Sequence, residues 1–179
     1  DVTGVQTCAL PISRPAYRQV AFSGDGTTLV FSSGSSESAP VGVFAMDVAS
    51  LSMEAISVDS RGVLSAGAAD SFSVSRDGNR IAFRGRGDDL APGDGNGSSD
   101  IFIRDRRQGL TQLVSRAASG TRSGDWGSYH PKLSADGGTV AFMSFADDLV
   151  EGDFNDQPDV FEVSIPRWLD LEVNRLAGS

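Results

Sequence analysis

The chain has 179 residues, of which 39% are hydrophobic and 21 are glycine, a composition typical of a globular protein with many tight turns. Its formal net charge is −9, with 24 acidic against 15 basic residues, which argues against a general nucleic-acid partner because phosphate neutralisation needs a basic patch. The longest uninterrupted apolar run, Val43–Met46, is far shorter than the roughly 20 residues of a membrane-spanning helix, so we expect no membrane span.

Residues 1–13 are interpreted as a non-native segment. One DNA sequence that encodes Val2–Ile12 resembles a common short-read sequencing adapter, so we exclude the segment from reasoning about the fold. Cys8, the single cysteine, belongs to this segment. The native part is therefore predicted to be residues 14–179, with neither a disulfide framework nor thiol chemistry.

A short pattern occurs three times in the chain. The copies begin at Phe22, Val74 and Leu133, which are 52 and 59 residues apart, and each has an apolar residue, Ser, a variable residue and Asp-Gly before an apolar segment. Asp-Gly tolerates the positive φ angles of a tight turn, so each copy predicts a β-hairpin. The segments Ile81–Phe83 and Val140–Phe142 are apolar on both faces, which favours sheets that pack against a neighbour on either side.

Two further strands are expected after each hairpin. The third strands are predicted at Val43–Met46, Ile101–Ile103 and Val160–Val163, and the fourth at Met53–Val58, Leu110–Val114 and Leu169–Val173. No segment shows helical periodicity long enough for a crossover helix. The prediction is an all-β fold, a partial β-propeller of about three four-stranded antiparallel blades near residues 18–62, 70–124 and 128–179. A β-sandwich is the alternative, but the threefold repeat argues against it, because a sandwich does not require a repeat.

The motif Ser-x-Asp-Gly-x-x-[Ile/Val]-Ala-Phe, followed by [Ile/Val]-Phe-[Ile/Val]-x-Asp, resembles the TolB-like propeller repeat. The resemblance covers almost everything after Ser13. It implies a closed ring of about six or seven blades, of which three blades are about half. The first copy departs from the motif at Leu29–Val30, and the third has Ser164 where Asp47 and Asp105 stand in the others.

An acidic loop is duplicated between the second and third strands of the last two repeats. The two copies, residues 88–100 and 147–159, share the pattern Asp-x-Asn-x-x-x-Asp, which places oxygen atoms at the offsets of the first, third and seventh positions of calcium loops. The predicted calcium ligands are Asp94, Asn96 and Asp100 in one loop and Asp153, Asn155 and Asp159 in the other.

An EF-hand is not predicted for either loop. The glycine expected at the sixth position is Ser99 or Pro158, and the acid expected at the twelfth, Asp105, lies beyond a strand at roughly 15 Å. The alternative to a metal site is a set of solvated turns, in which Asp and Asn bond to their own backbone. The acidic residues that precede the motif either complete a site or end a strand: Asp88, Asp89, Asp147 and Asp148.

Catalytic residues are not recognisable in the sequence. There is no Gly-x-Ser-x-Gly motif, and His130 is the single histidine, which argues against a Ser-His-Asp triad. His130 is interpreted as a structural or surface residue just before a strand. Trp126 and Tyr129, placed in a loop between blades, either form a ligand platform or cover the next blade.

Five arginines fall on or just beyond neighbouring strands. They either form a positive site for an anionic ligand or pair with nearby aspartates across strands. They are Arg84, Arg86, Arg104, Arg106 and Arg107.

The sequence thus predicts a non-catalytic binding or scaffold module, periplasmic or extracellular, for a protein or carbohydrate partner, with calcium as its one candidate cofactor. The alternative follows from the resemblance, because similar propellers precede the catalytic domain of prolyl-oligopeptidase-like serine peptidases. In that case the catalytic domain is absent from this chain. Pro166–Trp168 departs from the earlier repeats and is interpreted as a domain boundary.

Overall fold

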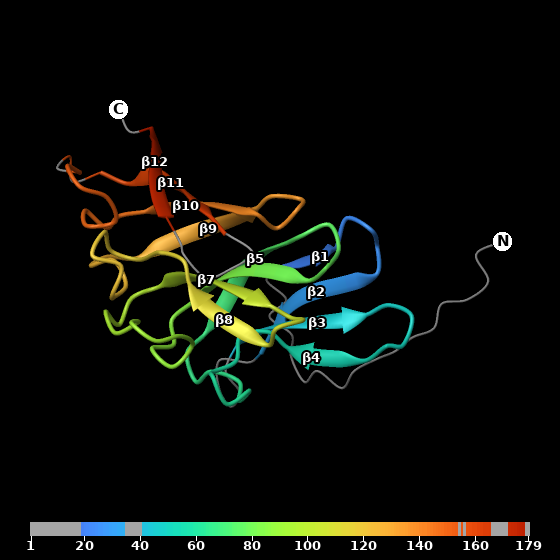
Figure 1. The fold of residues 1–179 in the computed structure, drawn as a ribbon. Helices are drawn as coiled ribbons and strands as arrows, with labels where there is room; N and C mark the ends of the chain where they lie inside the picture. The colour runs from blue at the N-terminus through green and yellow to red at the C-terminus, as the bar shows by residue number, and fades with distance from the viewer. Residues whose placement is uncertain (1–18, 35–40, 154, 156, 166–171, 178–179) are drawn as a thin grey trace.

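The computed structural model describes residues 19–34, 41–153, 155, 157–165 and 172–177 (Figure 1). The segment predicted to be adapter-derived and Pro166–Trp168 lie outside these residues. Every regular element in the described ranges is a β-strand, and they contain no helix long and apolar enough to cross a membrane.

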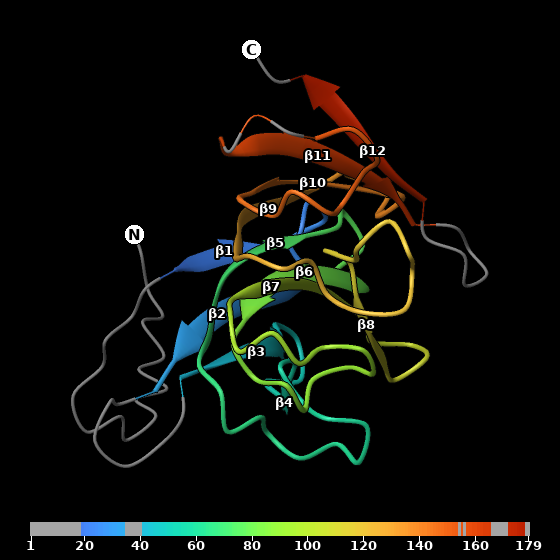
Figure 2. The same cartoon turned by 90° about the vertical axis from the view of Figure 1, so that its left-hand side faces the viewer.

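Twelve strands form three antiparallel four-stranded sheets, in which strands that follow one another in the chain pair. Blade one contains β1 (Val20–Phe22), β2 (Thr28–Ser33), β3 (Gly42–Asp47) and β4 (Met53–Ala55). Blade two contains β5 (Ala69–Val74), β6 (Arg80–Gly85), β7 (Asp100–Asp105) and β8 (Leu110–Leu113). Blade three contains β9 (Ser128–Leu133), β10 (Thr139–Ser144), β11 (Asp159–Ser164) and β12 (Glu172–Ala177). Figure 2 shows the sheets stacked one on the next, with β1, β5 and β9 on the same side of the stack. The predicted partial, all-β propeller is confirmed.

The outer strands differ in their bounds from the sequence prediction. In blade one, the N–H groups of Ile56 and Ser57 both donate to the carbonyl oxygen of Val43, at 2.8 and 3.4 Å, which ends the ladder between β3 and β4 early. Blade two repeats this arrangement at the end of β8. In blade three, β12 begins at Glu172, and residues 169–171 of the strand predicted at 169–173 lie outside the described residues.

The repeated Ser-x-Asp-Gly motif forms the turn between the first two strands of each blade. In blade two, Ser75 Oγ donates to Asp77 Oδ1 at 2.8 Å and accepts the N–H of Arg80 at 3.0 Å. Asp77 Oδ1 also accepts the N–H of Asn79, and Gly78 ends the turn with a φ of 68°. The other two blades make the same bonds. Positive φ is therefore confined to the glycine, while the aspartate acts as an acceptor within the turn.

Backbone hydrogen bonds join these turns from blade to blade. The N–H of Asp25 in blade one donates to the carbonyl of Arg76 in blade two at 2.9 Å, and the N–H of Arg76 donates to the carbonyl of Ala135 in blade three at 2.7 Å. Between the innermost strands, the side-chain amide of Gln19 bonds to both the N–H and the carbonyl of Phe72. The motif turns of successive blades are thus hydrogen-bonded to each other through their backbones.

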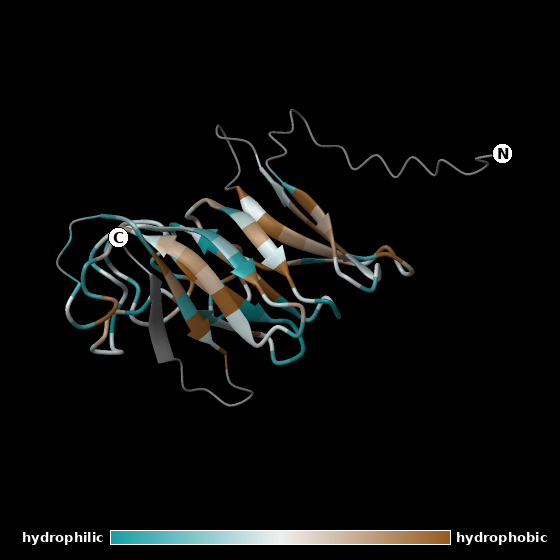
Figure 3. Cartoon of the chain, turned by 90° about the horizontal axis from the view of Figure 1, so that it is seen from above, coloured by the Kyte–Doolittle hydropathy of each residue, from teal (hydrophilic) through white to brown (hydrophobic). Residues whose placement is uncertain are grey.

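The hydrophobic core lies between the blades. Each blade carries a stacked pair of phenylalanines on one face of its two middle strands, with ring centroids 5.7 to 5.8 Å apart: Phe31 with Phe44, Phe83 with Phe102, and Phe142 with Phe161. The pair of blade two packs on Val30, Val43 and Ala45 of blade one, and the pair of blade three packs on Ala82, Ile101 and Ile103 of blade two. Figure 3 shows hydrophobic segments, in brown, along the strands. The prediction that each sheet packs against neighbours is confirmed, with phenylalanines on one face and aliphatic residues on the other.

Alanine substitutions at two turn glycines distinguish the cost of backbone strain from the cost of a close contact between blades. A Cβ at Gly26 would meet nothing within 4 Å, whereas a Cβ at Gly78 would lie 2.4 Å from Thr28 Oγ1 of blade one. We expect Gly26→Ala to lower the free energy of unfolding by about 1–2 kcal/mol, because an alanine is strained at positive φ. Gly78→Ala should lower it by more, because the contact between blades must also open. Urea unfolding followed by circular dichroism measures both, and equal losses would contradict the close contact at Gly78.

Candidate functional site

The acidic loop of blade two, residues 88–100, lies between the connections that lead into and out of the blade. Towards the preceding connection, Ser65 Oγ donates to Asp89 Oδ1 at 2.5 Å. Towards the following one, residues 114–127, the N–H of Ser123 donates to the carbonyl of Gly93 at 2.8 Å. The loop therefore links three consecutive segments of the chain at the end of the blades opposite the Ser-x-Asp-Gly turns.

The predicted metal ligands of blade two are buried to different extents. Asp100 is fully buried, and its Oδ1 accepts a hydrogen bond from Ser115 Oγ at 2.6 Å. Oδ2 of Asp100 and both carboxylate oxygens of Asp94 are buried and make no hydrogen bond of ordinary geometry, although Asn96 lies beside Asp100, and Gly95 and Ser123 lie beside Asp94. Asn96 is fixed on both sides, since its Oδ1 accepts the N–H of Ser98 at 2.7 Å and its Nδ2 donates to the carbonyl of Gly124 at 2.7 Å.

The two carboxyl groups of this loop have raised pKa values. Burial raises the pKa of Asp100 to about 7, against the hydrogen bond from Ser115, and the negative charge of Asp94 raises it further. Burial also raises the pKa of Asp94 to about 6, and the charge of Asp88 adds to that rise. The charges of Asp94 and Asp100 therefore act on each other.

The corresponding loop of blade three is similar in part. Asp153 and Asp159 are buried, and Asn155 Nδ2 donates to Asp159 Oδ2 at 3.3 Å. Asn155 Oδ1 accepts the N–H of Gln157 at 3.0 Å. Asn96 and Asn155 each accept a hydrogen bond from the backbone N–H two residues later, as the solvated-turn alternative predicts. Asp153 and Asp159 are buried, however, which that alternative does not predict.

Two of the other acidic residues of the loops, Asp89 and Asp148, hold the preceding connections. In blade three, Asp148 accepts the N–H of Asp125 at 3.0 Å and forms an ion pair with Arg122 at 2.7 Å, in the place that Asp89 occupies in blade two. Within the described residues, no group of three or more His, Cys, Asp or Glu is arranged to hold a metal ion. A cation site in blade two therefore has to include the amide oxygen of Asn96.

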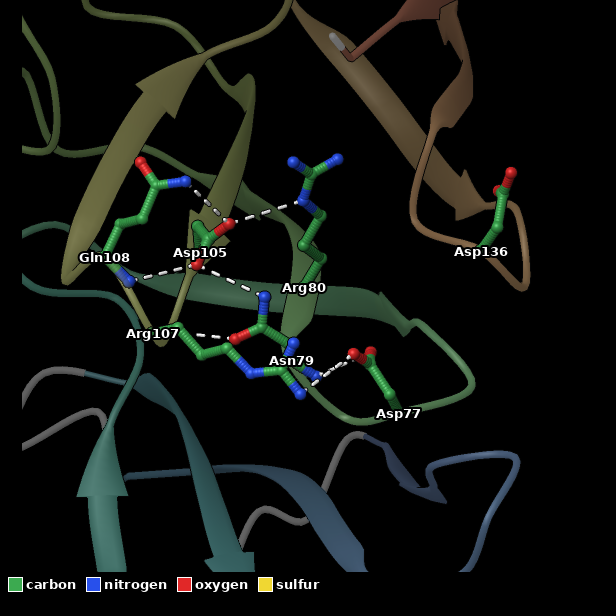
Figure 4. A pocket seen from close by; sticks show the side chains of 7 residues that line it. All are labelled: Asp77, Asn79, Arg80, Asp105, Arg107, Gln108 and Asp136. Atoms are coloured by element: carbon green, nitrogen blue, oxygen red, sulfur yellow. Dashed lines mark hydrogen bonds and ion pairs between the residues drawn. The ribbon is translucent and has the colours of Figure 1, made fainter. Parts of the chain in front are cut away.

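A second candidate site is an open pocket at the opposite end of blades two and three, with a volume of ≈ 470 Å³ (Figure 4). Its lining is polar or charged throughout: Asp77, Asn79, Arg80, Asp105, Arg107, Gln108 and Asp136. Two of these residues, Asp77 and Asp136, are the motif aspartates of successive blades, so the repeat itself brings them to one end of the propeller.

Hydrogen bonds fix the inner side chains of this pocket. Asp105 accepts from the side chain of Asn79 at 3.2 Å and from Arg80 Nε at 3.4 Å, and Gln108 donates to both of its oxygens. At the rim, Arg107 and Asp77 form an exposed ion pair at 3.3 Å. The pocket thus has a hydrogen-bonded floor and a charged, exposed rim, whose ion pair holds its side chains weakly.

Strand β9 contains two residues that were predicted to precede it. Tyr129 and His130 lie inside the strand, where the pairing with β10 shifts register and His130 takes a φ of 56°. Tyr129 packs edge-on against Phe145, with centroids 5.9 Å apart, and lies beneath the guanidinium of Arg84. Tyr129 thus contacts a residue of its own blade and an arginine of the blade before it, while Trp126 is exposed.

The arginines of blade two pair with neighbouring side chains. Arg84 forms a two-pronged ion pair with Asp70, its partner across β5 and β6. The others bond as follows: Arg86 to Ser99, Arg104 to Thr111, Arg106 to Glu54 and Arg107 to Asp77. Pairing across and between strands, rather than a common positive site, is what the structure shows.

Three stacked four-stranded meanders, with the core between them, define this chain as part of a β-propeller. Comparison with known proteins shows a TolB-like fold. TolB from Acinetobacter baumannii superposes with a TM-score of 0.57 at 18% identity over 93% of this chain and 33% of that one. A protein described as TolB from Agrobacterium tumefaciens gives 0.56 at 17% identity over 92% of this chain and 50% of that one.

A peptidase propeller is similar as well. The β-propeller domain of the Trilobed protease from Pyrococcus furiosus superposes with a TM-score of 0.53 at 9% identity, over 89% of this chain and 43% of that one. The chain therefore spans at most half the length of these structures. No family model matches it, and no curated protein matches it in sequence.

Acid should weaken the turn that borders the pocket. Hydrogen bonds from Ser134 Oγ and the N–H of Gly138 hold the pKa of Asp136 below its usual 3.8. A lowered pKa in the folded state stabilises the fold above pH 3.8, and this stabilisation is lost as the pH falls through the folded-state value. We expect Asp136→Asn, which cannot titrate, to be less stable than the wild type at about pH 6 and to lose less stability on moving to about pH 3. Urea unfolding at both pH values tests this, and identical acid sensitivity of the two proteins would contradict it.

Proposed function

We propose that this chain is a non-catalytic binding or scaffold part of a β-propeller, and that its partner is a protein or a carbohydrate. The observation that carries the proposal is the polar pocket at the junction of blades two and three (Figure 4). We further propose a periplasmic or extracellular location, in keeping with the resemblance to TolB.

The lining of the pocket suits a ligand rich in hydrogen-bonding groups. It offers amide groups from Asn79 and Gln108, a guanidinium from Arg107 and carboxylates from Asp77 and Asp136, so donors and acceptors of both charges lie within one pocket. Sugar hydroxyls and peptide amides both donate and accept, and they can satisfy such a mixed set. An apolar ligand would leave these groups unpaired on binding, which costs affinity.

The residues of the pocket are poorly suited to acid–base catalysis. Asp105, the most enclosed carboxylate of the pocket, already accepts hydrogen bonds from three residues, and Arg80 donates to the carbonyl oxygens of Gly137 and Ile165. Proton transfer requires a group that is free to gain or lose a proton near the substrate. The pocket therefore supports recognition better than acid–base catalysis.

The alternative is the propeller segment of a prolyl-oligopeptidase-like serine peptidase. Its support is the likeness to the Trilobed protease propeller, which is close to the likeness to TolB. The complete gene discriminates between the two. A hydrolase domain with a Gly-x-Ser-x-Gly elbow would favour the peptidase, and further blades without one would favour the binding module.

Removing the charged rim should weaken partner binding without unfolding the chain. We expect Arg107→Ala, made with Gln108→Ala, to lower affinity for glycans or peptides captured on arrays by about tenfold, the loss of one or two hydrogen bonds to a charged group. The matched control is Arg61→Ala, which removes an equally exposed arginine from an ion pair with Asp59 outside the pocket. Array binding that is unchanged in the double variant, or lost equally in the control, would contradict a binding role for the pocket.

A further inference from the structure

We propose that two copies of this chain associate through the sheet faces at the two ends of the stack. The outer face of blade one in one copy packs on the outer face of blade three in the other, where the outer face is the one turned away from blade two. The residues of these two faces do not line the polar pocket, so the inference is separate from the proposed binding function.

The outer face of blade one is apolar across all four strands. Paired residues of neighbouring strands share a face, and so do residues two apart in one strand, so the strand register places two rows of side chains on it. One row is Val20, Phe31, Phe44 and Ala55, and the other is Phe22, Leu29, Met46 and Met53. All eight are hydrophobic. The residues that alternate with them, such as Val30 and Ala45, pack on blade two.

This face is exposed in blade one, whereas the corresponding face of blade two is buried. Val20 is 64% exposed and Phe22 is 61% exposed, but Phe72, which takes the place of Val20 in blade two, is 2% exposed. Phe31 and Phe44 are only half-buried, and neither belongs to the two core clusters of the described residues. A contiguous exposed apolar surface of this kind marks an interaction site.

The contacts inside the stack indicate what a phenylalanine face binds. The phenylalanine pair of blade two packs on aliphatic residues of blade one, and the pair of blade three packs on Ala82, Ile101 and Ile103 of blade two. In both cases the partner is the aliphatic face of another sheet. Among the described residues, the phenylalanine face of blade one has no such partner.

The outer face of blade three is the matching surface. The residues that take the places of Ala82, Ile101 and Ile103 are Ala141, Val160 and Glu162. Two of these three positions are again apolar, and Met143 is paired with Val160 on the same face. Val160 is 47% exposed, although its counterpart in blade two is fully buried. Glu162 is the exception, and its charge makes this contact weaker than those inside the stack, even where its methylene groups pack and its carboxylate stays in water.

The stack is curved, which favours a closed pair of copies over an open column. Successive sheets approach most closely along the innermost strand of the later blade, β5 or β9, and they spread apart towards the outer strands (Figure 2). A contact between two different faces closes into a ring when each repeat turns about a common axis. Two copies related by a twofold axis make the contact twice, so neither copy keeps an open face.

Sedimentation equilibrium of the 179-residue chain between about 1 and 300 µM tests the association. We expect a dissociation constant of about 10–100 µM, so that the chain is a monomer at the low end, where unfolding is measured, and a dimer at the high end. Val20→Glu and Val160→Glu each place a charge in one of the two faces and should weaken the dimer by about tenfold or more. Both side chains are exposed in the single copy, so circular dichroism at the lowest concentration should show an intact fold. The matched control is Val63→Glu, because Val63 is 56% exposed but lies in the connection between blades one and two.

A second measurement needs no variant. The dye ANS binds exposed apolar surface, so its binding per chain should fall as the concentration rises through the dissociation constant. Four results would overturn the proposal: a wild type that stays monomeric at about 300 µM, a dimer that Val160→Glu leaves intact, equal weakening by Val63→Glu, or assemblies larger than a dimer. An intact dimer in Val160→Glu would show that two blade-one faces pair with each other, and larger assemblies would show an open column.

Discussion

The contact between the phenylalanine face of one blade and the aliphatic face of the blade before it is the interaction on which this structure depends. Side chains alternate between the two faces of a strand, so a strand such as Ile81–Phe83 presents apolar atoms on both sides of its sheet. Neither face can be left in water without a large loss of hydrophobic stabilisation. Stacking one sheet on the next buries both, and Phe83, Phe102 and Ala82 have no exposed surface.

This packing leaves the two ends of the blades for recognition. At one end, the Ser-x-Asp-Gly turns are short and hydrogen-bonded from blade to blade, and the aspartates of two of them, Asp77 and Asp136, line the pocket of Figure 4. At the other end, the acidic loops reach over the connections between blades. Both candidate sites therefore lie at junctions of blades, where one repeat alone could not build them. A substitution in either site is expected to affect the adjoining blade as well.

Much of the fold could be predicted from the sequence, because the repeat is encoded locally. Ser75, Asp77 and Gly78 make a turn whose bonds all lie within a few residues, and Phe83 marks the strand that follows. Four strands per repeat and the absence of helical periodicity then favour a propeller. The strand ends were less predictable, because the early end of β4 depends on a shared bond to Val43 from another strand.

The sites were harder to predict, because they depend on contacts between distant residues. The spacing of Asp94, Asn96 and Asp100 indicated a calcium loop, but only the structure shows that Asp100 is buried beside Ser115. The pocket around Asp105 was not predicted as a site. Its residues come from three turns, and the equal position of Asp77 and Asp136 in the repeat was the signal that could have indicated it. The placement of His130 within a strand depends on the irregular pairing of β9 with β10.

The most direct test of this account compares one position in two blades. Phe83 is fully buried against blade one, whereas Phe31, its equivalent in blade one, is only half-buried. If the core lies between blades, Phe83→Ala should lower the free energy of unfolding by about 3–5 kcal/mol and Phe31→Ala by less than about half of that. Equal losses in urea unfolding would contradict the account, because they would place the stabilising contacts within each sheet.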